Sequence, residues 1–181
     1  MAGSFPKQFT DRDGRTVAIR YLSPDDYDGV FNLFQRIPTR WRQFIHETVE
    51  SRDAVEHWLS RLDPVLDVPL VAVRDGVIVA ATSLFRRDRG PLRHHGRLRF
   101  TVDTAVYPYL VGTKLVDEIL LFAKESGLEA VTISLIEDVE AEEIDALVGL
   151  GFEKAAVIPK YAKDQIGNLH GMVFLVHRLG H

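Results

Sequence analysis

The strongest constraint on the fold is a β-α-β pattern in the middle of the chain. Residues 98–104 alternate like a strand, and Ala130–Ile136 form an apolar run typical of a buried strand. Between them we predict a helix that opens at Gly112, carries apolar residues at helical spacing, and stops at Gly127. A connection of this kind places the two strands beside each other, with the helix packed over them.

A β-hairpin is predicted before this unit. Two apolar runs, Val68 to Val73 and Val77 to Phe85, flank a short turn that contains Asp75 and Gly76. Asp-Gly between two apolar runs is typical of a type I′ turn, because glycine accepts the positive φ that this turn requires. A further short strand is predicted at Thr16–Tyr21, where polar and apolar residues alternate.

The remaining segments complete an alternating order of elements. Two helices are predicted ahead of the hairpin, one over residues 23–37 and one from Ser51 onward. An acidic helix near residues 139–148 precedes two closing strands, near 152–158 and 170–179. The order β-α-α-β-β-β-α-β-α-β-β predicts an α+β domain of the α/β type, with one mixed sheet of six to seven strands and four helices.

Six large side chains are predicted to lie in the core, because each occupies an apolar helix face or the end of the acidic helix. They are Phe31, Phe34, Trp58, Leu115, Ile119 and Phe152.

Composition excludes several classes of protein. The chain has 181 residues, so we expect one domain over residues 1–181, with residues 1–14 loosely ordered. It has no cysteine, which excludes disulfides and thiolate chemistry. Because there is neither a signal-peptide pattern nor an apolar run of about 20 residues, we expect a cytoplasmic protein. A net charge of −4 gives no reason to expect nucleic acid or a membrane as partner.

The order of elements and two stretches of sequence resemble the GNAT superfamily of acyl-CoA-dependent N-acetyltransferases. The stretches are DGRTVAIRYLSPDD (13–26) and GLGFEKAAVIPKYAKDQIGNLHGMVFLVHRL (149–179), and they look most like GNAT domains of bacterial protein-lysine acetyltransferases. The similarity covers nearly the whole chain. It implies a sheet splayed between the fourth and fifth predicted strands. It also implies an enzyme that moves an acetyl group from acetyl-CoA, its co-substrate, to an amine.

The resemblance also implies where coenzyme A binds. In such proteins a strand ends near the acyl group, and the following turn and helix N-terminus bind the pyrophosphate, because free N–H groups and the helix dipole favour an anion. On this sequence the implied cofactor-binding residues are Val102, Val111, Gly112 and Thr113.

Several functional positions of the family hold other residues here. The family's loop, Gln/Arg-x-x-Gly-x-Gly/Ala, falls on Tyr107, Leu110 and Gly112, so only its last glycine is kept. The strand carboxylate of many members falls on Arg97, and the tyrosine that protonates the leaving thiolate falls on Leu147. We therefore assign no catalytic residue. A second hypothesis stays open, that of a non-catalytic GNAT-fold module that senses acyl-CoA or binds a protein partner.

Two further clusters each have two interpretations. The adjacent His94 and His95 are either a stand-in base or ordinary strand residues; their side chains point opposite ways, so no metal site is expected. The acidic run Glu137 to Asp145 is either an exposed helix face or a surface that attracts a basic substrate such as a lysine side chain. The expected partner is a small-molecule or protein amine, and assembly as a homodimer stays open.

Overall fold

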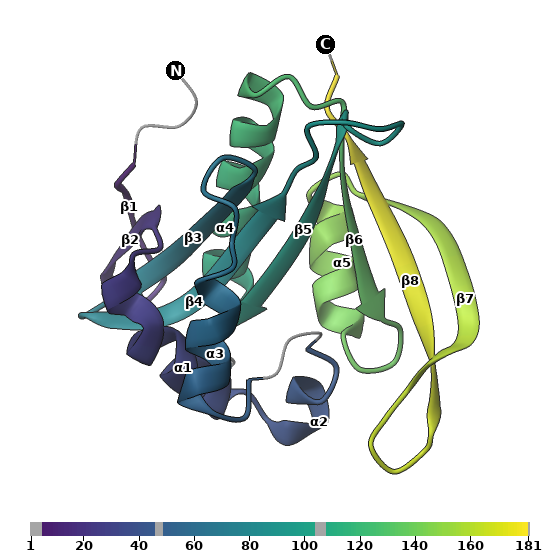
Figure 1. Cartoon of the computed structure of the whole chain (residues 1–181), viewed down its shortest axis with the longest axis horizontal. Coiled ribbons are helices and arrows are strands. Elements are labelled where there is room, and N and C mark those ends of the chain that lie inside the picture. The colour runs from purple at the N-terminus through teal and green to yellow at the C-terminus, as the bar shows by residue number, and fades with distance from the viewer. Residues whose placement is uncertain (1–4, 46–48, 104–107, 181) are drawn as a thin grey trace.

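A computed structural model describes residues 5–45, 49–103 and 108–180. These residues form one eight-stranded sheet in the order β1-β2-β3-β4-β5-β6-β8-β7 (Figure 1). The strands are β1 (Lys7–Thr10), β2 (Thr16–Tyr21), β3 (Asp67–Arg74), β4 (Val77–Phe85), β5 (His95–Val102), β6 (Ala130–Ile136), β7 (Glu153–Lys163) and β8 (Leu169–Arg178). The α-helices are α1 (Tyr27–Arg36), α2 (Thr39–Arg42), α3 (Arg52–Leu59), α4 (Pro108–Glu125) and α5 (Ala141–Gly149), and a 3-10 turn, η1 (Pro24–Asp26), precedes α1.

The predicted mixed α/β architecture is confirmed, but its count of elements needs correction. The described residues contain eight strands rather than six to seven, and five α-helices rather than four. The added strand is β1, which lies within the stretch that we expected to be loosely ordered. Asp11 stabilises the turn that joins β1 to β2. Its Oδ1 accepts the backbone N–H groups of Asp13 and Arg15, and its Oδ2 forms an ion pair with Arg74 at 2.8 Å. The added helix is α2, a single turn whose sequence has no helical periodicity.

The predicted hairpin is present as β3 and β4. Arg74 lies opposite Val77, and the two residues between them, Asp75 and Gly76, have φ values of 51° and 78°. Positive φ at both central residues is the signature of a type I′ turn. The turn type was therefore predicted correctly from the Asp-Gly pair.

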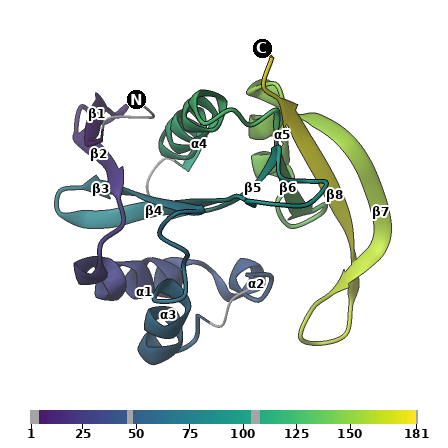
Figure 2. The ribbon, with the colours of Figure 1, turned by 45° about the horizontal axis from the view of Figure 1, so that its top comes forward.

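Helices cover both faces of the sheet (Figure 2). Helix α4 lies on one face, and α1, α2 and α3 lie on the other. Two clusters of buried side chains result: a large one in which α4 and α5 pack on strands from both ends of the sheet, and a smaller one in which α1 and α3 pack on β3 and β4. Among the described residues, no helix combines the length and apolar character needed to cross a bilayer.

Four of the six predicted core residues are buried: Phe34, Leu115, Ile119 and Phe152. The other two residues, Phe31 and Trp58, were predicted to be buried but are only partly buried, at the edge of the smaller cluster. The buried face of α1 is centred on Val30 and Leu33, so Phe31 lies to one side of it, and Trp58 lines a cavity described below.

The sheet opens between β5 and β6, as the family resemblance implied. The two strands are parallel and pair at only three positions, from His95 opposite Ala130 to Arg97 opposite Thr132. Beyond Arg97 each strand continues without pairing to the other, and Figure 1 shows them separating toward their carboxyl ends. The result is a V-shaped opening whose closed end lies at His95 to Arg97.

Gly96 lies at the closed end of this V, where the packing leaves no room for a side chain. A Cβ at this position would lie 2.5 Å from Leu84 Cδ1 and 3.0 Å from Leu128 Cδ1. Leu84 is fully buried, so it has little freedom to move aside. Glycine at position 96 therefore allows β5 and β6 to pair against the packed core.

We expect Gly96→Ala to lower the free energy of unfolding by about 1–3 kcal/mol, because overpacking a tight core displaces its neighbours. Gly149→Ala is the matched control, since a Cβ at this helical position would meet no atom within 4 Å. Urea denaturation of both variants measures the difference. A Gly96→Ala protein as stable as the native one would show that the apex of the V tolerates a side chain.

Candidate functional site

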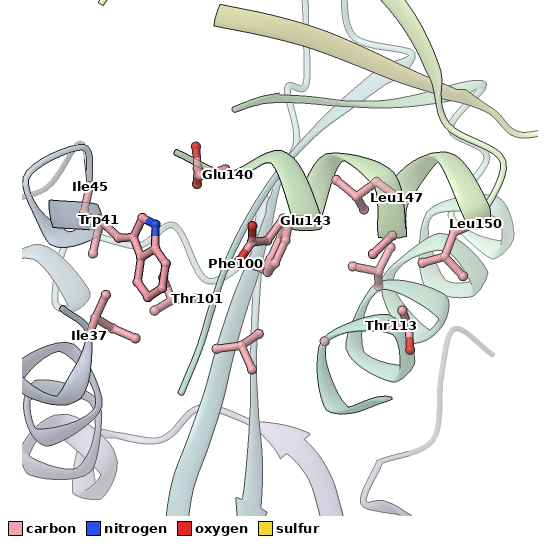
Figure 3. Close-up of a pocket in the computed structure, with 14 residues that line it drawn as sticks. Ile37, Trp41, Ile45, Phe100, Thr101, Thr113, Glu140, Glu143, Leu147 and Leu150 are labelled. Carbon is pink, nitrogen blue, oxygen red and sulfur yellow. The ribbon is translucent and has the colours of Figure 1, made fainter. Parts of the chain in front are cut away.

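Two cavities meet in the V between β5 and β6. The α4–α5 cavity, of about 100 Å³, lies between α4, α5 and the end of β5 (Figure 3). The α2 cavity, of about 380 Å³, lies toward α2 and is bounded by β5, β6 and parts of β7 and β8. Five residues line both: Trp41, Ile45, Phe100, Thr101 and Glu140. The opening of the sheet thus connects a site on one face to a site on the other.

The structure brings together three of the four predicted cofactor-binding residues. Val102, Gly112 and Thr113 all line the α4–α5 cavity. Val111 does not line it, because its side chain is fully buried in the large core cluster. Tyr107, which occupies the first position of the family's loop, lies outside the described residues.

Helix α4 begins at Pro108 and not at Gly112, which corrects the predicted start. Proline is favoured at the first position of a helix, because its fixed φ suits the helix and its missing N–H would have had no partner there. Gly112 and Thr113 therefore lie in the second turn, where an α-helical N–H faces the carbonyl four residues back. The N–H groups that point outward from this end belong to Tyr109 and Leu110, since Pro108 has none.

Gly112 has a packing role that the sequence motif did not reveal. A Cβ at this position would lie 3.2 Å from Val102 Cγ2, so the glycine lets α4 approach β5 closely. Thr113 is turned back on its own helix, where its hydroxyl donates to the carbonyl of Leu110 at 3.1 Å. Both residues thus shape the wall of the α4–α5 cavity.

The backbone of β5 presents hydrogen-bonding groups to the opening. The N–H of Asp103 donates to the carbonyl of Val79 at 2.8 Å, on the β4 side. Successive residues of a strand direct their N–H and C=O groups to opposite edges, so those of Phe100 and Val102 point toward β6. Consistently, the carbonyl of Gly96 accepts the Thr132 hydroxyl of β6 at 3.3 Å. Since pairing ends at Arg97, the groups of Phe100 and Val102 face the cleft.

The two residues that align with the family's catalytic positions, Arg97 and Leu147, do not supply catalytic groups here. Arg97 lines the α2 cavity, and its guanidinium lies 5.2 Å from the centre of the Phe85 ring. Leu147 lines the α4–α5 cavity and is 2% exposed, as an apolar wall residue. The expectation that the His94 and His95 side chains point opposite ways was wrong, because their ring centres lie 4.2 Å apart. His95 pairs at the closed end of the V, and neither histidine lines either cavity.

Glu140 and Glu143 are candidate site residues that the sequence pattern did not indicate. Both were counted in an acidic helix face, yet both are half-buried and line the α4–α5 cavity (Figure 3). Burial, with a smaller contribution from the nearby Glu143, raises the pKa of Glu140 to about 7, although the hydrogen bond from the N–H of Ile136 acts to lower it. Burial also raises the pKa of Glu143 above its ordinary value. The sequence did contain one indication of this role, which is the position of Glu140 in the chain. It lies between a buried strand and the helix that follows that strand.

Trp41 connects α2 to the start of α5 across the cleft. Its indole N–H donates to the carbonyl of Val139 at 2.9 Å, next to Glu140. Two further contacts join the same region to the β7–β8 turn: Gln43 Oε1 accepts the N–H of Gln165 at 3.2 Å, and the rings of Phe44 and His170 lie 5.1 Å apart. Helix α2 therefore forms the outer wall of the α2 cavity.

Comparisons with known proteins identify the fold. No protein-family model and no curated protein matches the sequence. Solved structures do match: a putative acetyltransferase from Salmonella typhimurium, determined with its cofactor acetyl-CoA, has a TM-score of 0.78 at 17% identity, covering 91% of this chain and 95% of that one. A ribosomal-protein-alanine N-acetyltransferase from Brucella melitensis has a TM-score of 0.76 at 19% identity, covering 89% and 99%.

A GCN5-related N-acetyltransferase from Kribbella flavida also has a TM-score of 0.76 at 19% identity, covering 90% of this chain and 98% of that one. At these identities the likeness concerns the fold. The chain has the fold of the GNAT superfamily, as the sequence resemblance implied.

The raised pKa of Glu140 predicts a pH-dependent stability. Between about pH 4.5 and 7 the folded protein keeps a proton that the unfolded chain has released, so the native protein loses stability as pH rises through this window. The loss is about 1.4 kcal/mol per pH unit. We expect Glu140→Gln, which cannot ionise, to gain stability relative to the native protein from pH 5 to pH 8.

Urea denaturation at both pH values measures this gain, and Glu142→Gln, at an exposed position of the same helix, controls for loss of one negative charge. A stability difference between Glu140→Gln and the native protein that stays constant with pH would contradict the environment assigned to Glu140.

Proposed function

We propose that the chain is an N-acetyltransferase that transfers an acetyl group from acetyl-CoA to an amine of a small molecule or a protein in the cytoplasm. The observation that carries this proposal is the opening of the sheet at the carboxyl ends of β5 and β6. In sheets with parallel strands, ligands bind outside the carboxyl ends of the strands, where neighbouring connections diverge. The Salmonella structure, with a TM-score of 0.78, contains acetyl-CoA and supports the same co-substrate here.

The residues present fit acetyl-CoA in three respects. The N-terminus of α4 is the positive end of the helix dipole, and the N–H groups of Tyr109 and Leu110 point outward, where they can donate to phosphate. Beside it, β5 offers the backbone groups of Phe100 and Val102 to the amide groups of the pantetheine arm. The α4–α5 cavity, of about 100 Å³ and lined mostly by apolar side chains, suits a short acyl group. Val102, Gly112 and Thr113 form its wall.

The acceptor amine enters through the α2 cavity. This cavity reaches the opening from the opposite face and shares Phe100, Thr101 and Glu140 with the α4–α5 cavity. Transfer from a thioester to an amine depends mainly on holding the two reactants in contact, which contributes about 7–11 kcal/mol in favourable cases. A backbone N–H of β5 that points into the cleft is placed to stabilise negative charge on the carbonyl oxygen.

Binding of acetyl-CoA is expected to be weak. Tyr107 stands where the family's loop has a polar residue, Leu110 stands where it has a glycine, and Pro108 lacks an N–H. Loss of two hydrogen bonds to a charged group, at about 1.5 kcal/mol each, weakens binding roughly 100-fold. From a micromolar starting point we predict a dissociation constant on the order of 0.1 mM, which isothermal titration of the native protein measures. A low-micromolar value would show that other groups replace the missing contacts.

A cavity-filling substitution tests where acetyl-CoA binds. Ala146 lines the α4–α5 cavity from α5, whereas Ala141 is exposed on the same helix. We expect Ala146→Phe to weaken binding of acetyl-CoA at least tenfold in isothermal titration, since the ring occupies the cavity. Ala141→Phe is the matched control and should bind like the native protein.

Release of free thiol from acetyl-CoA measures turnover with a panel of amines: a lysine peptide, a peptide with an N-terminal alanine, a polyamine and free amino acids. Turnover that is lost in Ala146→Phe and kept in Ala141→Phe supports the enzyme. Binding of acetyl-CoA without turnover of any amine would favour the alternative, a non-catalytic module that senses acyl-CoA. Equal binding by both variants would place the ligand elsewhere.

A further inference from the structure

We infer that Glu140 is the general base of the proposed reaction, the group that takes a proton from the acceptor amine. This inference rests on the proposed function, because it assigns a role within that reaction. The strand position at which many GNAT proteins carry a carboxylate holds Arg97, which cannot accept a proton at neutral pH. A proton acceptor must therefore come from another part of the cleft.

Glu140 is the one described carboxylate that reaches both cavities. Glu143 lines the α4–α5 cavity only, and no other aspartate or glutamate among the described residues lines either one. A base must contact an amine that arrives from the acceptor side while that amine touches the acetyl group on the other side. Glu140 meets this requirement because it lies at the junction of the two cavities.

The position of Glu140 is fixed from two directions. Its Oε2 accepts the backbone N–H of Ile136 at 2.6 Å, and its own N–H donates to the Ile136 carbonyl at 2.9 Å. The indole of Trp41 holds the carbonyl of the preceding residue, Val139. One hydrogen bond occupies only part of the acceptor capacity of a carboxylate, so lone pairs remain for a proton from the substrate.

The chemistry then balances as follows. An amine acceptor of the lysine type is protonated at neutral pH, so it must lose a proton before its nitrogen can attack. Glu140 accepts this proton and releases it to water through the α2 cavity. The nitrogen lone pair forms the C–N bond at the thioester carbon as the C–S bond breaks. The second nitrogen proton ends on the departing thiolate, which leaves as free coenzyme A.

The charged groups around Glu140 set the pH at which it works. Burial and the negative charge of Glu143, on α5, hold the pKa of Glu140 at about 7. Arg97 and Arg99, on β5, line the α2 cavity as positive groups, whereas α2 contributes the uncharged Trp41 and β7 and β8 contribute apolar side chains. A base with a pKa near the working pH combines ionisation with sufficient basicity. The rate should therefore rise with pH through about 7.

The test compares the native protein with Glu140→Gln, using the amine of the panel that the native protein acetylates fastest. Glutamine keeps the shape and can still accept the Ile136 N–H. We expect Glu140→Gln to lower kcat by about 10²–10⁴-fold, to remove the rise of kcat near pH 7, and to leave acetyl-CoA affinity within about twofold. Glu142→Gln, exposed on the same helix, should keep the native kcat and pH profile.

The possible outcomes separate the two proposals. Native kcat in Glu140→Gln would overturn the assignment of the base and leave the acetyltransferase in place. Loss of acetyl-CoA binding in Glu140→Gln, in parallel with kcat, would also overturn it, because the residue would then be structural. Absence of turnover by the native protein with every amine would overturn the proposed function and, with it, the role of Glu140.

Discussion

The arrangement of the whole cleft depends on the point at which β5 and β6 stop pairing. Three residue pairs join the strands, and the ladder ends at Arg97. At this end Gly96 allows the strands to meet against Leu84 and Leu128. Further along the two strands diverge, and α4 and α5 pack in one core cluster and border the α4–α5 cavity. Separation of the strands thus creates both cavities and exposes the backbone of β5.

The two halves of the sheet stay together because the two faces are packed differently. On the α4 face, one large cluster joins side chains of β2, β3 and β4 to side chains of β6 and β8. On the other face, the strand residues that the described part of the chain contributes to the smaller cluster of α1 and α3 come from β3 and β4. The halves are therefore joined on one side and open on the other, where α2 and the β7–β8 turn enclose the α2 cavity. Entry of an acceptor from that side follows from this asymmetry.

Local patterns predicted the fold well and the site only in part. The Asp75-Gly76 turn and the β-α-β unit depend on neighbours in sequence, and both are present, although α4 starts at Pro108 rather than at Gly112. Strand β1 depends on pairing with β2, and α2 on contacts with distant residues, so neither has a periodic signal. Gly112 was recognised but interpreted as a helix start, because its contact with Val102 is visible only in three dimensions. Glu140 looked like part of an exposed face, because its place in the walls of both cavities is visible only in three dimensions.

Backbone amide chemical shifts during titration with acetyl-CoA test the central claim, that the opening between β5 and β6 is the acyl-CoA site. We predict that the resonances of Phe100, Val102, Leu110 and Thr113 move together with one saturation curve. Resonances of β1 and of the β3–β4 turn should stay in place. Shifts confined to a surface away from α4 and β5, or no shifts at millimolar acetyl-CoA, would contradict it.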